Sequence, residues 1–314
     1  MKNRITEMLG VKYPIVQAPM GWIARSPLAS AVSNAGGMGI IETSSGELDN
    51  IRAEIRKMRE LTDKPFGVNI AQAFVRDPDI VSFVVDQGVK FVTTSAGDPN
   101  KYCGQLKAAG LTVFHVVPSL HAAQRAIEAG VDGLVVEGGE GGGFKNPREV
   151  ALMVLLPLIC SKVGVPVIAA GGIVDGRTMA AAFALGAEGV QMGTRMVSAA
   201  ESPVHQNWKD AIVAAKETDT VFLNRFGPGP ALRALRTEKT ATYEREGGDN
   251  IMGEFRNALD LYFGGNMEGS IALSGQVAGR IEGVKPVAEI IAETVAEFDE
   301  TIAALARQYG RVEA

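Results

Sequence analysis

The amino-acid sequence predicts a (β/α)8 barrel, in which eight parallel strands alternate with helices. One local pattern recurs along the chain: a helix ends at a glycine, and a strand rich in valine and isoleucine begins within three residues. Glycine suits this position because it tolerates the left-handed backbone that closes a helix. The pattern occurs at residues 34–41, 87–94, 109–116, 129–136, 163–170 and 185–192.

The predicted strands show little alternation between apolar and polar residues. Strands buried on both faces have this composition, and a parallel sheet covered by helices buries both of its faces. Eight nearly regular units favour closure into a barrel over the alternative, a doubly wound open sheet. The eight candidate strands are residues 13–18, 38–43, 66–70, 91–95, 112–117, 133–137, 166–170 and 189–193.

Polar residues or glycines stand where the predicted strands end. In barrels of this kind the active site lies at the carboxyl ends of the strands, so we expect the chemistry among these residues. They are residues 20–21, 43–44, 69, 94–95, 118–119, 137–138, 171–172 and 193–194.

Residues 206–272 depart from the repeat. We expect them to be mostly helical, with glycine and proline interruptions, and to form a lid over the barrel mouth. The barrel then comprises residues 1–205 and 273–314. The tail after Pro286 is expected to form one amphipathic helix on the barrel wall, because apolar residues recur there at helical spacing. These are Val287, Ile290, Ile291, Val295 and Phe298.

Composition argues against several classes of protein. The net charge of −5 argues against nucleic-acid binding, which needs an excess of basic residues. The longest apolar run, 150–160, is too short to cross a membrane, and the first residues lack the apolar core of a signal peptide. Two cysteines, Cys103 and Cys160, suit a reducing compartment. We therefore expect a cytoplasmic protein that acts on a small molecule.

Two glycine turns follow the seventh and eighth predicted strands. They contain Gly171-Gly172 and Gly193-Thr194. The loops after these strands commonly hold a phosphate in such barrels, because backbone N–H groups approach the anion closely at glycine. Asp175 is a good N-cap for a helix over 177–185. Arg195 is expected either to face the phosphate or to lie on the surface.

Several side chains are candidates for acid–base chemistry. Glu137 and Glu140, at the exit of strand six, act either as acid–base groups or as partners of backbone amides. His115 faces either the barrel mouth or the packed wall, and we favour a structural role for it and for His205. His121 is expected to face solvent. No spacing of cysteine, histidine and carboxylate residues suggests a metal site.

The predicted lid carries a run of cations, and Tyr243 is a candidate proton donor there. The cations could bind the phosphates of a CoA thioester or of NADPH. Acidic residues interrupt the run, so we favour a solvated surface of mixed charge. The cations are Arg225, Arg233, Arg236, Lys239 and Arg245.

Taken together, the motifs resemble the nitronate monooxygenase (2-nitropropane dioxygenase-like) flavoprotein family. That family includes the FMN-dependent enoyl-acyl carrier protein reductase II enzymes and related NAD(P)H:quinone reductases. The resemblance covers nearly the whole chain and rests on residues 13–22, 35–40, 61–69, 135–143, 169–172, 191–195 and 274–276.

The resemblance implies FMN in the barrel mouth. Asn69 would bond the flavin ring system, and Gln191 and Glu137 would also belong to the cofactor site. The residues that would lie along the flavin are Ala18, Pro19, Met20 and Gly21, and those that would hold the phosphate are Gly171, Gly172, Gly193 and Thr194.

One position departs from the family pattern. Nitronate monooxygenases carry a histidine after the glycine stretch beyond strand six, and it is the candidate base for a nitroalkane. Phe144 stands here, followed by Lys145 and Asn146. Phenylalanine neither accepts nor donates a proton, which weakens the nitronate monooxygenase interpretation. Anionic nitronates need no base.

We favour an FMN-dependent oxidoreductase that takes electrons from NAD(P)H and reduces an activated acceptor, either an enoyl thioester or a quinone. No separate dinucleotide fingerprint is present, so the nucleotide is expected to bind transiently at the flavin. The alternatives are nitronate oxidation with oxygen, a flavin-free phosphosugar isomerase or aldolase, and a non-catalytic flavin-binding module. An acyl thioester partner and a homodimer are left open.

Overall fold

The computed structural model describes residues 1–227, 229–247 and 251–310. At its centre lies a barrel of parallel strands in the order β1-β9-β8-β6-β5-β4-β3-β2. A bridge between Val16 and Met38 joins β1 to β2 and closes the barrel. All eight predicted strands are present: β1 (Ile15–Gln17), β2 (Gly39–Ile41), β3 (Phe66–Ala71), β4 (Phe91–Ser95), β5 (Thr112–Val117), β6 (Gly133–Glu137), β8 (Val167–Ala170) and β9 (Gly189–Met192).

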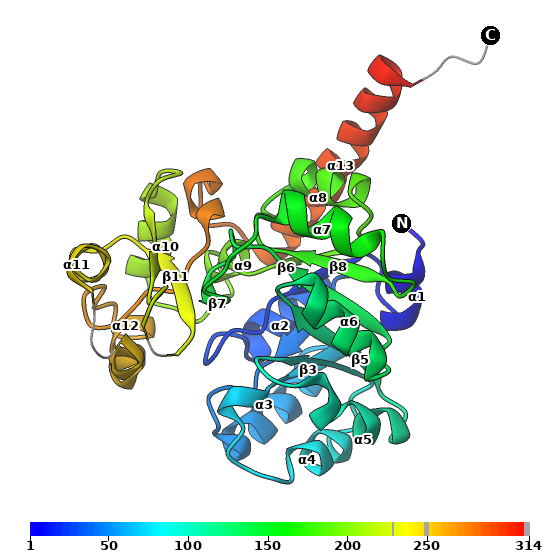
Figure 1. Cartoon of the computed structure of the whole chain (residues 1–314), viewed down its shortest axis with the longest axis horizontal. Coiled ribbons are helices and arrows are strands. Elements are labelled where there is room, and N and C mark those ends of the chain that lie inside the picture. The colour runs from blue at the N-terminus through cyan, green and yellow to red at the C-terminus, as the bar shows by residue number, and fades with distance from the viewer. Residues whose placement is uncertain (228, 248–250, 311–314) are drawn as a thin grey trace.

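Helices surround the barrel on the outside (Figure 1). They alternate with the strands along the chain, which confirms the predicted (β/α)8 fold. Those associated with the barrel are α1 (Arg4–Leu9), α2 (Ser26–Asn34), α3 (Leu48–Leu61), α4 (Ile80–Asp86), α5 (Cys103–Ala108), α6 (Leu120–Glu128), α7 (Leu152–Cys160), α8 (Gly176–Ala184), α9 (Thr194–Val197) and α13 (Val287–Tyr309). None of the described helices is long and apolar enough to cross a membrane.

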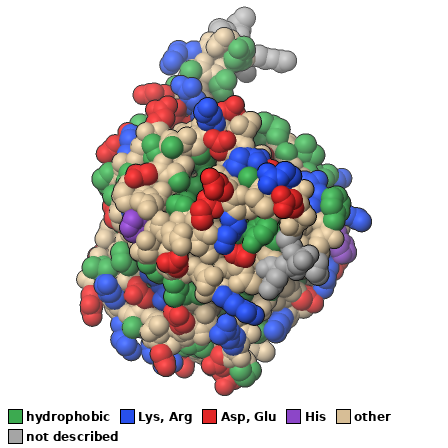
Figure 2. Space-filling model, turned by 90° about the vertical axis from the view of Figure 1, so that its left-hand side faces the viewer, with side chains coloured by type: hydrophobic (Ala, Val, Ile, Leu, Met, Phe, Trp, Pro, Cys, Tyr) green, Lys and Arg blue, Asp and Glu red, His purple; other side chains and the backbone are tan. Residues whose placement is uncertain are grey.

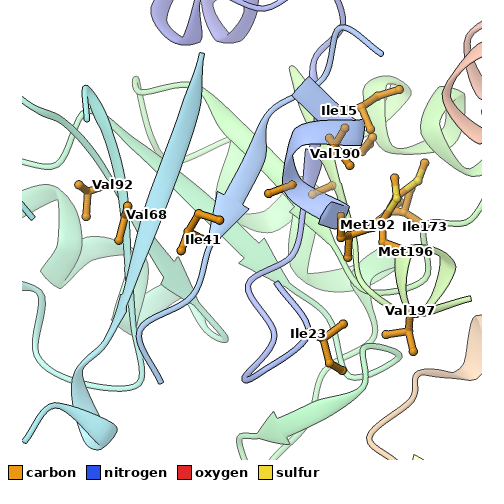
Figure 3. Packing of buried hydrophobic residues seen from close by; sticks show 14 of the residues in the cluster. Ile15, Ile23, Ile41, Val68, Val92, Ile173, Val190, Met192, Met196 and Val197 are labelled. Carbon is orange, nitrogen blue, oxygen red and sulfur yellow. The ribbon is translucent and has the colours of Figure 1, made fainter. Parts of the chain in front are cut away.

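The strands are apolar on both faces because the barrel has two cores. Val16, Ile40 and Phe114 belong to one buried cluster, to which α1 contributes Ile5 and Leu9. The adjacent strand residues pack in a second, larger cluster with the helices. Figure 3 shows members of that outer cluster on five strands: Ile15, Ile41, Val68, Val92, Val190 and Met192.

The lid segment contains two strands that the sequence analysis did not predict. β10 (Thr220–Leu223) pairs with β11 (Ala231–Leu235), and β11 pairs with β7 (Gly143–Lys145), which follows β6 of the barrel. The expectation of a mostly helical segment is corrected to a mixed one. β10 and β11 are neighbours in the chain and pair with each other, and β11 also pairs with β7, which lies far away in the chain. The helices of the lid are α10 (Gln206–Ala214), α11 (Glu238–Glu246) and α12 (Ala258–Tyr262).

The tail helix α13 returns to the barrel as predicted and packs on α8 and α2. Its outer end extends away from the barrel (Figure 1). The contact with α8 is close: a Cβ atom on Gly176 would lie 2.2 Å from the backbone nitrogen of Phe298. Gly176 N also donates to Glu297 Oε2 at 2.9 Å. Glycine at the start of α8 therefore sets how closely the two helices approach.

Candidate active site

A cavity of about 690 Å³ lies at the carboxyl ends of the barrel strands, and residues of the lid segment, among them Trp208, Phe255 and Tyr262, also line it. Its volume is in the range of small-molecule sites, ~300–1,000 Å³. Except for Tyr243, the structure brings together on its wall the residues predicted for the site. They are Ala18, Pro19, Met20, Gly21, Asn69, His115, Glu137, Glu140, Gly171, Gly172, Gln191, Gly193 and Thr194.

The turn after β8 has a backbone that favours glycine. Gly171 and Gly172 have φ angles of +84° and +78°. A Cβ atom on Gly171 would lie 2.9 Å from the carbonyl oxygen of Gly138 and 3.1 Å from the amide nitrogen of Gly141. The turn therefore presents bare backbone to the cavity, as close approach to an anion requires.

The turn after β9 faces the same part of the cavity. Thr194 Oγ1 accepts a hydrogen bond of 2.8 Å from Gly275 N, so its own hydroxyl proton is available to a ligand. Gln191 is 7% exposed, and its Oε1 has no hydrogen-bond partner among the described residues. A buried acceptor without a partner costs free energy, which a donor on a bound ligand would offset.

The cap of the following helix is as predicted. Asp175 accepts from Thr178 N at 2.8 Å and forms a capping box with Thr178 at the start of α8. Arg195 has neither of its two expected positions. It is buried outside the cavity lining, and its Nη1 donates to Ser198 Oγ and Gly283 O at 3.0 and 3.1 Å. Burial lowers the pKa of Arg195.

Asn69 and His115 are fixed by neighbouring strands. Asn69 Nδ2 donates to Thr93 Oγ1 at 3.0 Å, which orients its amide on the cavity wall. The Nδ1 atom of His115 lies 2.7 Å from Thr94 Oγ1, and burial lowers the pKa of His115 to about 4. The imidazole is therefore neutral at neutral pH and is a poor proton donor there.

The two carboxylates after β6 have different partners. Glu140 accepts from Leu152 N at 2.9 Å, so it holds a backbone amide at the start of α7. Glu137 binds the ammonium of Lys145 from β7. The side chain of Lys145 is 4% exposed and lines the cavity. The sequence analysis noted Lys145 beside Phe144 but assigned it no role.

Phe144 forms part of an apolar wall. Its ring packs between Phe74, at a centroid distance of 5.3 Å, and Phe255, at 5.4 Å. All three residues line the cavity. None of these three rings exchanges a proton.

A buried carboxylate, Glu42, was missed by the sequence analysis. It is fully buried, pairs with Arg25 at 2.8 Å and accepts from Trp22 N at 3.2 Å. Trp22 has a φ angle of +60°, which is uncommon outside glycine. Glu42 therefore stabilises the loop that carries Met20 and Gly21. Position 42 lies at the end of a predicted strand, where site residues were expected, so the sequence offered a signal by which Glu42 could have been found.

The remaining candidates lie at the edge of the cavity or away from it. Tyr243 is not part of the cavity wall; it donates to Glu254 Oε1 at 2.7 Å, and this hydrogen bond raises the pKa of Tyr243 to about 12. His205 caps the start of α10, which is a structural role. His121 is exposed and belongs to the residues that line the cavity.

The lid cations are paired with carboxylates. Acidic and basic side chains are interspersed on the lid face (Figure 2), which agrees with the predicted surface of mixed charge. Arg233 is the correction to that prediction, because its side chain is buried and bonds Gly139 O and Glu149. The pairs are Arg225–Glu149, Arg233–Glu149, Arg236–Glu244, Lys239–Glu254 and Arg245–Glu246.

Comparison with known protein families identifies the family of the chain. The family model for nitronate monooxygenase matches residues 2–81 and 71–297. The chain belongs to the nitronate monooxygenase family. It is therefore an oxidoreductase, from a family whose enzymes are flavoproteins. The flavin-free isomerase or aldolase receives no support from this membership.

The relatives cover more than one reaction. A (3aS,4S,5R,7aS)-5-hydroxy-7a-methyl-1-oxo-octahydro-1H-indene-4-carboxyl-CoA dehydrogenase of Mycobacterium tuberculosis is 40% identical over 244 residues, covering 76% of this chain and 67% of that protein. A probable nitronate monooxygenase of Staphylococcus saprophyticus is 32% identical over 308 residues, covering 82% of this chain and 86% of that protein.

Solved structures agree with the fold over nearly the whole chain. FabK from Thermotoga maritima has a TM-score of 0.91 and 40% identity, covering 98% of this chain and 99% of its own. A nitroalkane oxidase from Streptomyces ansochromogenes has a TM-score of 0.83 and 25% identity, covering 96% and 100%.

Proposed function

We propose that this protein is an FMN-dependent reductase that uses NAD(P)H to reduce an enoyl thioester. The observation that carries the proposal is one cavity in which two bare glycine turns face a wall of aromatic side chains. The turns suit a phosphate, and the aromatic wall suits an apolar acyl group. Similarity to FabK, an enoyl reductase, and to a dehydrogenase that is named for a CoA substrate supports a thioester over a quinone.

The residues on the wall fit FMN. Gly171, Gly172, Gly193 and Thr194 would hold the phosphate, and the unpartnered Oε1 of Gln191 would accept from a hydroxyl or ring N–H. When bound, FMN supplies transfer of a hydride, that is, of two electrons and one proton. The chain contributes binding, orientation and the exclusion of water.

An anaerobic titration tests this function. The purified protein, loaded with FMN, is titrated with NADH and NADPH while its visible spectrum is recorded. We expect the flavin band to bleach with one of the nucleotides and to return on addition of crotonyl-CoA. A protein that does not bleach with either nucleotide, or that stays bleached with crotonyl-CoA and recovers with a quinone, would contradict the proposed reaction.

Nitronate oxidation is the second candidate, because the family and the nitroalkane oxidase neighbour favour it. A neutral nitroalkane must first lose a proton, and Phe144 has no atom that accepts one. We expect wild-type protein to oxidise preformed ethyl nitronate at most, and Phe144→His to gain oxidation of neutral nitroethane. Oxygen consumption measures both. If Phe144→His leaves nitroethane oxidation at zero, the explanation by a missing base is wrong.

A further inference from the structure

We infer that Lys145, paired with Glu137, delivers the proton that completes reduction of the enoyl thioester; this inference rests on the function proposed above. Lys145 belongs to the lid sheet, since it pairs with Ala231 of β11. Glu137 ends barrel strand β6. The ion pair therefore joins lid and barrel, and both residues line the cavity.

The local backbone is shaped to admit this pair. A Cβ atom on Gly141 would lie 2.6 Å from Lys145 Nζ and 2.9 Å from Glu137 Oε1. Any larger residue at position 141 would therefore collide with the two charged groups. Taking an ammonium out of water is costly, so a nearly buried lysine needs a partner such as Glu137. The lid does not need this ion pair for anchoring, because Arg233 already bonds Gly139 O at 2.8 Å and Glu149 at 2.7 Å.

Several other charged or polar groups on the cavity wall are poor proton donors. His115 is neutral, with a pKa lowered by burial to about 4. Glu140 holds the amide of Leu152, and Glu149 holds Arg225 and Arg233. The guanidinium of Arg125 pairs with Asp98. An arginine side chain does not release its proton in proteins. Among the described residues of the wall, the ammonium of Lys145 is the buried cation that can release one.

The reaction requires such a group. A hydride, derived from NAD(P)H, forms a C–H bond at the β-carbon of the thioester. The electron pair of the C=C bond then forms a double bond between the α-carbon and the carbonyl carbon, and the π pair of the carbonyl group moves onto its oxygen, which gives an enolate. Lys145 then gives its proton to the α-carbon, and the saturated thioester results. The neutral amine regains a proton from water. NAD(P)H is oxidised to NAD(P)⁺, and the C=C bond is reduced.

Lys145→Met tests the inference, because it keeps the length of the side chain and removes the proton. Two half-reactions are followed by stopped flow: bleaching of bound flavin by NAD(P)H, and its reoxidation by crotonyl-CoA or by ferricyanide, which takes electrons without protonation of a carbon. We expect bleaching and the ferricyanide reaction to be unchanged, and reoxidation by crotonyl-CoA to slow by about 100-fold or more. Equal loss with both acceptors, or no loss with either, overturns the inference.

Binding provides a readout that does not depend on turnover. Acetoacetyl-CoA forms an enolate that resembles the reaction intermediate, and calorimetry measures its dissociation constant. We expect this constant to rise about tenfold or more in Lys145→Met, as the loss of a charged hydrogen bond predicts, and to be partly restored in Lys145→Arg. Equal binding by wild type and Lys145→Met would overturn the inference.

Lys239→Met is the matched control. It breaks another ion pair of the lid, with Glu254 at 2.7 Å, outside the cavity wall. We expect both half-reactions and acetoacetyl-CoA binding to be unchanged in it. If it slows crotonyl-CoA reduction as Lys145→Met does, loss of lid structure explains both variants and the inference fails. A wild-type protein that reduces no enoyl thioester contradicts the proposed function itself, whereas an active wild type with an equally active Lys145→Met contradicts the role of Lys145 alone.

Discussion

Gly171 combines a left-handed backbone conformation with a place in the proposed phosphate site. An alanine there would adopt a left-handed backbone at a cost of roughly 1–2 kcal/mol and would also press on the carbonyl of Gly138. We expect Gly171→Ala to lower the free energy of unfolding by about that much or more and to reduce FMN content after purification. Urea unfolding and the visible spectrum measure the two effects.

Gly104→Ala is the control for that substitution. Gly104 lies in α5, and a Cβ atom there would meet nothing within 4 Å. We expect it to raise the free energy of unfolding by roughly 0.5–1 kcal/mol, because alanine favours the helix. If Gly171→Ala behaves like Gly104→Ala and keeps its FMN, the turn after β8 does not hold the phosphate.

His115 makes stability depend on pH. Burial lowers the pKa of His115 in the folded protein from 6.5 to about 4. Between these two pH values the imidazole binds a proton in the unfolded chain but not in the folded protein. We expect the contribution of neutral His115 to the free energy of unfolding to be complete above pH 6.5. It should be lost as pH falls toward 4, by up to about 3 kcal/mol. Urea unfolding at several pH values should show a smaller loss in His115→Asn. His121→Asn, at an exposed position, should keep the wild-type dependence.

The sequence predicted which residues line the site better than it predicted their partners. Glycines at strand ends and Asn69 could be assigned because strand order alone brings the carboxyl ends together. The pairing of Glu137 with Lys145 could not be assigned, because it depends on the fold of β7 against the lid. The burial of Arg195 was missed for a similar reason, since its partner Gly283 lies 88 residues away in the chain.

At the scale of elements, Arg233 connects the lid sheet to the barrel. Its side chain is buried and bonds Gly139 O, Glu149 and Thr220. We expect Arg233→Met to lower the free energy of unfolding by about 2–3 kcal/mol, because the carbonyl of Gly139 loses its partner and Glu149 keeps only Arg225. Arg236→Met, which breaks an exposed pair with Glu244, should cost less than about 1 kcal/mol in the same urea experiment. Equal costs would contradict the anchoring role.

Barrel elements were more predictable than lid elements. Each barrel strand is a short apolar run, most of these runs follow a helix and a glycine, and these signals are local in the chain. The lid strands β10 and β11 have no such signal, and β7 lies inside a glycine-rich loop. Their stability comes from pairing with each other, and the pairing of β11 with β7 joins segments as far apart in the chain as Lys145 and Ala231.

At the scale of the whole molecule, ligand binding should stabilise the fold. A ligand that binds only the folded protein adds about 2.7 kcal/mol at a concentration 100 times its dissociation constant. We expect FMN to raise the Tm of flavin-free protein and riboflavin, which lacks the phosphate, to raise it less. Differential scanning fluorimetry measures both. Equal shifts would show that the glycine turns do not bind the phosphate, and no shift with either would contradict flavin binding in this cavity.

The amino-acid sequence alone determined the barrel, the order of its strands along the chain, and the edge at which the site lies, because apolar periodicity and glycine placement are local properties. Only the tertiary structure decided that the lid contains a sheet, that Lys145 reaches Glu137, and that Tyr243 points to Glu254 away from the cavity. These features depend on contacts between distant parts of the chain, whose free energy no local pattern records.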